Sequence, residues 1–168
     1  MGLSKDNEAG RDLWRALEPL LRVSRVDWTI FWRQLTQVAK KYDGEESTDY
    51  EGMLNILINE GDSSPFYEPL SPEHRLQFLT WIEQWRDVVK DETGVAERMR
   101  LANPKYVLRE WMLVDAYSAA AEGDESVLKD LFELIQKPYD EGTPKQESQY
   151  YRRAHEDDLT LGGTAFMS

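Results

Sequence analysis

Lys105 and Arg109 are the two residues whose type and spacing best suit a chemical role, because they lie four positions apart in the sequence. On a helix, side chains at that spacing share one face, where two cations could grip a phosphate or an acidic partner. The same cations could instead fix the start of a helix against neighbouring carbonyl and carboxylate oxygens. We expect this second, structural role.

A nucleotide site would need a glycine-rich phosphate loop, a phosphate-pairing lysine on a strand, and a metal-binding Asp or Asn. The sequence has no G-x-G-x-x-G, Walker or Asp-Phe-Gly pattern, and Gly162-Gly163 follows no strand-to-helix transition. Carboxylates are abundant, but none forms a pattern that would place two of them across a scissile bond, and runs of like charge are typical of a solvated face. We therefore expect no catalytic and no cofactor-binding residue in this chain.

Two candidate metal sites fail on spacing. His74 and His155 lie far apart, and neither has a second ligand at helical or loop spacing, whereas a zinc site needs three or four converging ligands. The acidic stretch that begins at Asp43 invites comparison with an EF-hand calcium loop. In that register Thr48 replaces the glycine of the sixth position and Leu54 replaces the glutamate of the twelfth. No metal site is expected.

Two tryptophan pairs, Trp28/Trp32 and Trp81/Trp85, each lie four residues apart and so share a helix face. Such pairs could line a ligand pocket. Their ordinary use is to bury a large aromatic area in a core or an interface, which is the role we expect.

Composition narrows the class of protein further. A length of 168 residues suits one domain, and 31% charged residues against about 25% in an average domain predict a thin core. The formal charge of -12 repels phosphate backbones, which argues against nucleic acid as a partner. Uninterrupted apolar runs reach only four or five residues, far short of the ~20 that span a bilayer, so no membrane-embedded segment is expected.

Cysteine is absent, which excludes disulfides, thiolate nucleophiles and thiolate metal ligands. The first ten residues have neither the apolar core of a secretory signal nor the Arg-rich, acid-poor character of a transit peptide. No targeting signal is therefore expected within this chain.

Hydrophobic periodicity predicts an all-α chain of about six helices in an irregular bundle. Pro19 is expected to break or kink the first helix, and Gly94 to end or bend the fourth. Asp27 and the Ser71-Pro72 pair are typical helix starts. The six expected helices cover residues 12–23, 28–42, 53–58, 72 to about 94 with a short extension over 95–102, 104 to about 122, and 125 to about 137. The apolar stripe of the second helix is Trp28, Phe31, Trp32, Leu35, Ala39 and Tyr42.

The fifth of these helices is expected to be capped by Asn103, with Pro104 at its first position and Gly123 just past its end. Two apolar rows would give it a broad face that needs two neighbours. From Gly142 to Ser168 the composition becomes polar, which predicts a largely extended tail and a boundary between residues 1–141 and 142–168. The two rows are Tyr106, Leu113, Tyr117 and Ala120, and Val107, Trp111 and Val114.

The segment Asn-Pro-Lys-Tyr-Val-Leu-Arg-Glu-Trp at 103–111 is followed, 26 residues past Trp111, by Lys-Pro-Tyr-Asp-Glu at 137–141. These segments resemble the C-terminal end of the selenoprotein O family, whose members are similar to protein kinases but transfer AMP to protein hydroxyls. The resemblance is specific from about Arg98 to Glu141 and weaker back to about Leu13. The residues that carry it are Asn103, Pro104, Lys105, Tyr106, Arg109, Trp111, Pro138, Tyr139, Asp140 and Glu141.

The resemblance implies the helical C-terminal part of a kinase-like protein adenylyltransferase, with the catalytic core outside this chain. The signature residues would be architectural. The parent would use ATP and magnesium to modify Ser, Thr or Tyr of protein substrates, and this region would pack on the kinase-like core in cis or in trans. By resemblance the location is mitochondrial in a eukaryote and cytoplasmic in a bacterium.

Two departures from the family pattern stand out. Members typically end with a redox-active cysteine or selenocysteine before two serines, whereas this chain ends Thr-Ala-Phe-Met-Ser. The Pro-Tyr-Asp-Glu motif is usually followed by Gln-Pro, and here by Gly142-Thr143-Pro144.

The alternative hypothesis is a free-standing, non-catalytic helical interaction module. Such a module would fold cooperatively as an isolated chain, whereas a severed appendage would expose a wide apolar surface.

Overall fold

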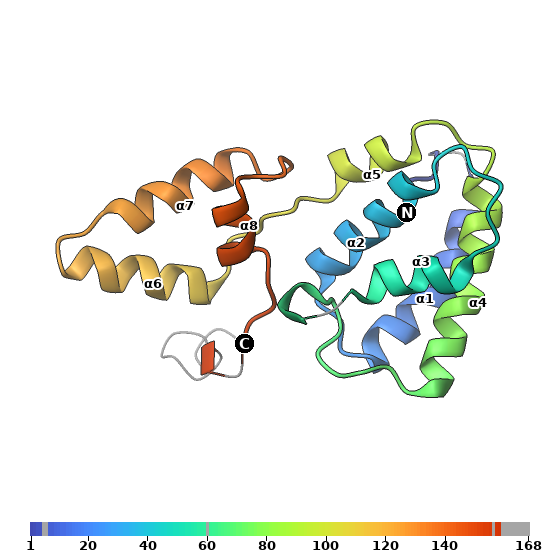
Figure 1. Ribbon diagram of the computed structural model, residues 1–168, viewed down its shortest axis with the longest axis horizontal. Helices are drawn as coiled ribbons and strands as arrows, with labels where there is room; N and C mark the ends of the chain where they lie inside the picture. Colours follow the sequence, from blue (N-terminus) through green and yellow to red (C-terminus); the bar gives the residue numbers. More distant parts are fainter. Residues whose placement is uncertain (5–6, 60, 156, 159–168) are drawn as a thin grey trace. The chain divides into compact units, whose positions relative to one another are not determined.

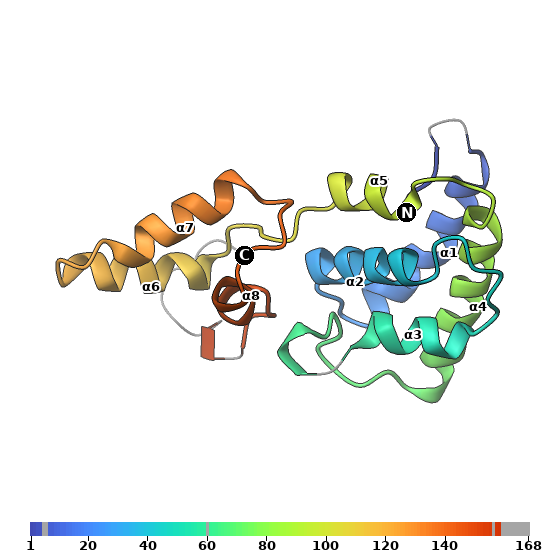
Figure 2. The same ribbon diagram turned by 45° about the horizontal axis from the view of Figure 1, so that its top comes forward.

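The computed structural model describes residues 1–4, 7–59, 61–155 and 157–158, and its regular elements are all helices (Figures 1 and 2). The all-α prediction is confirmed. The count of about six was low, since eight α-helices and one short 3-10 helix lie in the described residues. They are α1 (Ala9–Val23), α2 (Trp28–Lys41), α3 (Tyr50–Ile58), η1 (Gly61–Ser63), α4 (Pro72–Val89), α5 (Val95–Ala102), α6 (Glu110–Ala121), α7 (Ser126–Gln136) and α8 (Pro144–Tyr150).

The chain divides into two compact units, Met1–Asn103 and Pro104–Ser168. The first contains α1 to α5 and the second contains α6 to α8. Sequence composition had suggested a boundary after Glu141 and an extended tail beyond it. The tail prediction is wrong for Pro144–Tyr150, which forms α8, because Thr143 and Gln146 make a reciprocal capping box and Pro144 occupies the first turn.

The first unit has a core of its own. In it α1 packs on α4, α3 packs on both α2 and α4, and α5 packs on α2. Trp81 and Trp85 stack at the centre with ring centroids 6.2 Å apart, so the expected core role of this pair is confirmed. Large side chains that are almost fully buried there include Leu17, Ile30, Phe31, Leu35, Met53, Leu54, Leu57, Phe78, Trp81 and Trp85.

The predicted stripe on α2 is buried except at its first member. Trp28 is 56% exposed, and its ring meets Trp14 and Trp32 edge-on with centroids 5.8 Å and 5.5 Å away. Trp28 occupies the first turn of α2, in which Ile30 and Phe31 are buried, so the exposure concerns the Trp28 side chain and not the whole turn.

Two helix starts follow the local signals. The Asp27 carboxylate accepts the Ile30 amide at 3.0 Å, and the Ser71 hydroxyl accepts the His74 amide at 3.2 Å. These side chains satisfy amides that a helix start leaves without a partner. Both capping predictions are confirmed.

Pro19 lies inside α1, and the break that was one of the two expected outcomes does not occur, because the helix continues to Val23. Proline removes one hydrogen bond from a helix interior. The buried stripe of Leu13, Leu17 and Leu21 against α4 offsets that loss, so tertiary packing overrides the local signal.

Two buried arginines satisfy backbone carbonyls where segments end. Arg33, 1% exposed, donates from α2 to the carbonyl oxygens of Arg100 at 3.5 Å and Asn103 at 3.3 Å, at the C-terminal end of α5. Arg86 donates from α4 to the carbonyl of Tyr42 at 2.8 Å and to that of Glu45. Carbonyls at a helix end lack partners within the helix, so these cations join elements that are distant in sequence.

Within the described part of the chain, no helix has the length and hydropathy needed to cross a bilayer.

Trp81→Ala is expected to lower the free energy of unfolding by about 3–5 kcal/mol, because it empties a core position and leaves the Leu13 carbonyl without its indole donor at 2.9 Å. Leu76→Ala, on the same helix but 64% exposed, is the matched control and should change it by less than about 0.5 kcal/mol. Urea unfolding followed by far-ultraviolet circular dichroism measures both. Equal effects would contradict this description of the core.

Candidate functional site

The two signature segments meet each other in the second unit. The backbone amides of Lys105 and Tyr106 both donate to the carbonyl oxygen of Pro138, at 2.7 Å and 3.2 Å. A cap by the Asn103 side chain would need one of these two amides, and both donate to Pro138 instead. Residues 104–109 are extended or irregular, and α6 begins only at Glu110. The prediction of a helix starting at Pro104 is therefore wrong.

The side chain of Lys105 completes the junction. Only 4% of it is exposed, and its ammonium donates to the Glu141 carbonyl oxygen at 2.9 Å and the Glu141 carboxylate at 3.0 Å, and pairs with Glu147 of α8 at 3.2 Å. The rings of Tyr106 and Tyr151 lie 5.7 Å and 5.1 Å from the same nitrogen. A buried ammonium needs this density of oxygen and aromatic partners, because its desolvation is otherwise unfavourable.

Tyr106 is the second residue of the junction and is 1% exposed. Its hydroxyl donates to the same Glu141 carbonyl at 2.8 Å. Gly142 follows with φ of +73°, and a Cβ placed there would lie 2.5 Å from the Tyr106 hydroxyl oxygen. Glycine is therefore required at 142 both for its backbone conformation and for the approach of the phenol. We name the set Lys105, Tyr106, Pro138, Glu141 and Gly142 the Lys105 junction.

The remaining signature residues lie on either side of this junction. Asn103 belongs to the first unit, where its side-chain amide donates to the Met99 carbonyl at 2.8 Å at the end of α5. It therefore ends one helix instead of starting the next. Arg109 is the N-cap residue of α6, but its side chain makes no capping hydrogen bond, and its backbone carbonyl accepts the Met112 amide at 3.1 Å. Lys105 and Arg109 do not share a helix face.

Residues after α8 cover Trp111, the last residue of the first signature segment. Trp111 is 4% exposed, and the guanidinium carbon of Arg152 lies 3.7 Å from its ring centroid. Arg152 also pairs with Asp158 at 2.6 Å, and the Asp158 carboxylate accepts the His155 amide at 2.7 Å. We name the described residues that follow α8, 151–155 and 157–158, the strap.

The pKa of Asp158 reflects two opposing causes. Burial raises it, but the hydrogen bonds from Arg152 and from the His155 amide outweigh burial, so the pKa lies below its ordinary value of 3.8. The carboxylate is thus charged over the whole neutral range. It neutralises the guanidinium that stacks on Trp111.

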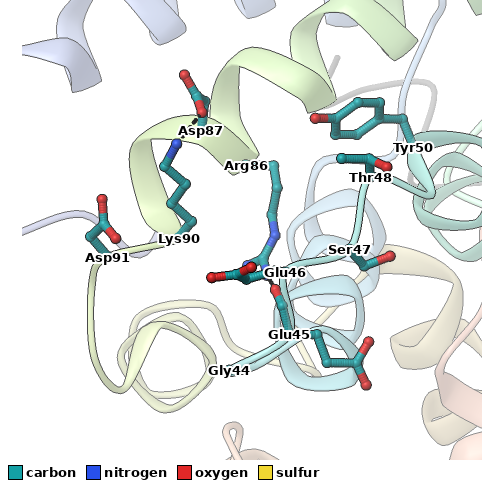
Figure 3. Close-up of a pocket in the computed structure, with 10 residues that line it drawn as sticks. All are labelled: Gly44, Glu45, Glu46, Ser47, Thr48, Tyr50, Arg86, Asp87, Lys90 and Asp91. Atoms are coloured by element: carbon teal, nitrogen blue, oxygen red, sulfur yellow. Dashed lines mark hydrogen bonds and ion pairs between the residues drawn. The ribbon is translucent and has the colours of Figure 1, made fainter.

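The first unit has a polar hollow of about 450 Å³ between α4 and the loop that precedes α3 (Figure 3). Arg86 points into this region from α4, and its guanidinium is engaged by the Tyr42 and Glu45 carbonyls. Lys90 pairs with Asp87 at 2.6 Å. The loop includes the acidic stretch compared above with a calcium site. Among the residues that the structure describes, no group of three or more His, Asp or Glu side chains is placed to hold a metal ion.

The contacts described here can position helices. At the Lys105 junction a cation is enclosed by carbonyl and carboxylate oxygens, the backbone of one segment is hydrogen-bonded to another, and the strap lies over the Trp111 indole. Lys105, Tyr106, Pro138 and Glu141, which the family resemblance singled out, make several of these contacts. That the signature residues are architectural stays a prediction.

Comparison with known proteins relates this all-helical chain to part of a class of protein nucleotidyltransferases. The relatives are named protein nucleotidyltransferase YdiU. One from Flavobacterium johnsoniae is 34% identical over 158 residues, which cover 91% of this chain and 28% of the relative. One from Rhodopirellula baltica is 27% identical over 154 residues, with 87% and 28% covered, and one from Vibrio vulnificus is 29% identical over 141 residues, with 84% and 26% covered.

The chain therefore spans about a quarter of the length of the curated relatives it matches. No protein-family model matches it. No solved structure matches it either.

Lys105→Met is expected to destabilise the second unit by about 1–3 kcal/mol, because it removes one of the two donors to the Glu141 carbonyl and the buried charge between two carboxylates. Lys129→Met is the matched control. Lys129 pairs with Glu125 but is 71% exposed, so its loss should cost less than about 0.5 kcal/mol. Hydrogen exchange of the Lys105 and Tyr106 amides measures the opening free energy. Unchanged exchange in Lys105→Met would contradict the junction.

The strap should loosen in acid. The pKa of Asp158 is lower in the folded chain than in the unfolded chain, where it is near 3.8. The charged carboxylate therefore stabilises the fold above about pH 3.8, and this stabilisation is lost as the pH falls through the folded-state pKa. The NMR signal of the Trp111 indole should therefore shift below about pH 4 in the native chain. In Asp158→Asn it should already have the shifted position at pH 7. A variant that titrates like the native chain would show that Asp158 does not hold the strap.

Proposed function

We propose that this chain belongs to the selenoprotein O family and forms the helical C-terminal portion of a kinase-like protein adenylyltransferase. The observation that carries the proposal is the similarity to protein nucleotidyltransferases over 91% of this chain and only 28% of a relative. The signature motifs add support, because the two segments that resemble the family contact each other directly.

The activity proposed for the whole protein is transfer of AMP from ATP to Ser, Thr or Tyr hydroxyls of other proteins, with magnesium. The residues that bind ATP and magnesium and perform this chemistry would lie outside the present chain. Lys105 supports this division of labour. Its ammonium is already engaged by the Glu141 carbonyl and by two carboxylates, whereas a phosphate-binding lysine must reach its ligand.

The partners proposed for the chain are the kinase-like core, in cis or in trans, and through that core its protein substrates. The relatives named above come from bacteria, for which the proposed location is the cytoplasm. A eukaryotic member would be mitochondrial.

One observation favours a second candidate, a free-standing helical interaction module. Each unit has its own buried cluster, one around Trp81 and Trp85 and the other around Tyr106, Trp111 and Leu131. Units with separate cores can fold without further chain. This candidate has no catalytic parent and would act by binding alone.

A graft separates the two candidates. The Flavobacterium johnsoniae relative, shortened by the segment that this chain matches, should lose incorporation of radiolabel from α-labelled ATP into protein. Replacing that segment with this chain should restore labelling to within about tenfold of the intact relative, whereas a graft carrying Lys105→Met should restore less.

A graft that folds, as judged by circular dichroism, but restores no labelling would favour the free-standing module. Labelling of protein by the 168-residue chain alone would contradict the placement of the catalytic residues outside it.

A further inference from the structure

The hairpin formed by α6 and α7 has two broad faces with different surroundings. The two helices run in opposite directions and pack against each other (Figure 1). Ala116 of α6 and Leu131 of α7 are buried, with 0% and 2% of their surface exposed. At 3.6 residues per turn, a residue one position after each of these points lies about 100° round its helix. Because the helices run in opposite directions, Tyr117 and Phe132 lie on the same face of the hairpin.

The opposite face is covered by α8 and the strap. Tyr150 is 4% exposed, and its pKa is raised by burial and by the nearby carboxylates of Asp130 and Asp115, which lie about 100° round their helices in the other direction. Lys145 of α8 lies 3.5 Å from Asp130, and Arg152 covers Trp111. This face is therefore covered by aromatic rings accompanied by basic groups.

The face that carries Tyr117 and Phe132 has no such cover among the described residues. Phe132 is 66% exposed, Tyr117 60% and Leu128 45%, and Leu128 and Phe132 are adjacent on α7 at four-residue spacing. We name Tyr117, Leu128 and Phe132 the open face. The sequence of α6 had called for two neighbouring elements, and on this side of the hairpin the described residues supply none.

The charge of the hairpin defines what can cover the open face. Residues 110–136 contain seven carboxylates and one lysine, a net charge of -6. Two copies of such a surface repel each other, and so do this surface and an anionic membrane or a nucleic acid. The segment that covers the other face, residues 144–153, carries three basic residues and one acidic residue, a net charge of +2. Within this chain, the acidic hairpin is therefore already covered on one face by a basic segment, and a basic partner would be complementary to the open face in the same way.

We propose that the open face of the α6–α7 hairpin is a docking surface for a basic amphipathic helix of a protein partner. The apolar side of that helix covers Phe132, Leu128 and Tyr117, in the manner of a helix seated on a groove. Its lysines and arginines meet carboxylates of the acidic hairpin, whose residues 110–136 carry a net charge of -6. This proposal does not rest on the adenylyltransferase assignment, because it follows from the exposure and charge of the hairpin alone.

The test uses the full chain and two synthetic helical peptides of about five turns, one of leucine and lysine and one of leucine and glutamate in the same pattern. Fluorescence anisotropy should show binding of the lysine peptide only. The double variant Leu128→Gln/Phe132→Gln should weaken that binding by at least about tenfold, and Tyr117→Gln, on the other helix, should weaken it as well. Leu76→Gln, equally exposed but in the first unit, is the matched control and should bind like the native chain.

Any of several results would overturn the proposal. The first is equal binding of the glutamate peptide, or no binding of either peptide. The second is undiminished binding by the double variant and by Tyr117→Gln when circular dichroism shows their helices intact. The third is a dimer of the native chain in sedimentation that Phe132→Gln dissociates, because the occupant of the open face would then be a second copy of the chain. Binding of the native chain to vesicles of anionic lipid through the same residues would also contradict the proposal.

Discussion

An ammonium group taken out of water must be met by oxygen atoms, and the second unit is built around one such group. Lys105 draws the Glu141 carbonyl, the Glu141 carboxylate and the Glu147 carboxylate to a single nitrogen. Those partners come from the turn after α7 and from α8, so one side chain joins this turn to α8. Tyr106 adds a second donor to the same carbonyl. The strap over Trp111 then follows from α8, because it continues directly from that helix.

In the first unit, buried arginines donate hydrogen bonds to backbone carbonyls. Carbonyl oxygens at the end of α5 and in the turn after α2 are satisfied by guanidinium groups from other helices, Arg33 and Arg86. Arginine suits this task because its planar fork presents several donors at once and is less strongly hydrated than an ammonium. The rest of that unit is held by burial of aliphatic and aromatic side chains around Trp81 and Trp85. Each unit thus combines an apolar core with a few cations that bind backbone.

Helix starts whose signal is local could be predicted from the sequence. Asp27 and Ser71 cap the helices that follow them because the capping side chain and the amide it accepts are three residues apart. The start of α6 could not be predicted in this way. Asn103-Pro104 is an ordinary helix-start pattern, but the amides beyond it donate to Pro138, more than thirty residues later, and no local rule weighs that competitor. For α8 the signal was present, since Thr143-Pro144 with Gln146 is a capping box, and the polar composition around it concealed it. The candidate site was recognisable as a set of residues, whereas the contacts among them required the fold.

The segment from Pro138 to Glu141 is held at both ends by the same two residues, since one carbonyl accepts their backbone amides and the other accepts their side chains. Its length is therefore matched to the distance between the backbone and the side-chain tips of Lys105 and Tyr106. Evolution can lengthen the α6–α7 hairpin at its exposed tip without disturbing that match. An insertion or deletion between Pro138 and Gly142 would move one carbonyl out of register with its donors, so variation in chain length among relatives should collect at the tip and spare this turn.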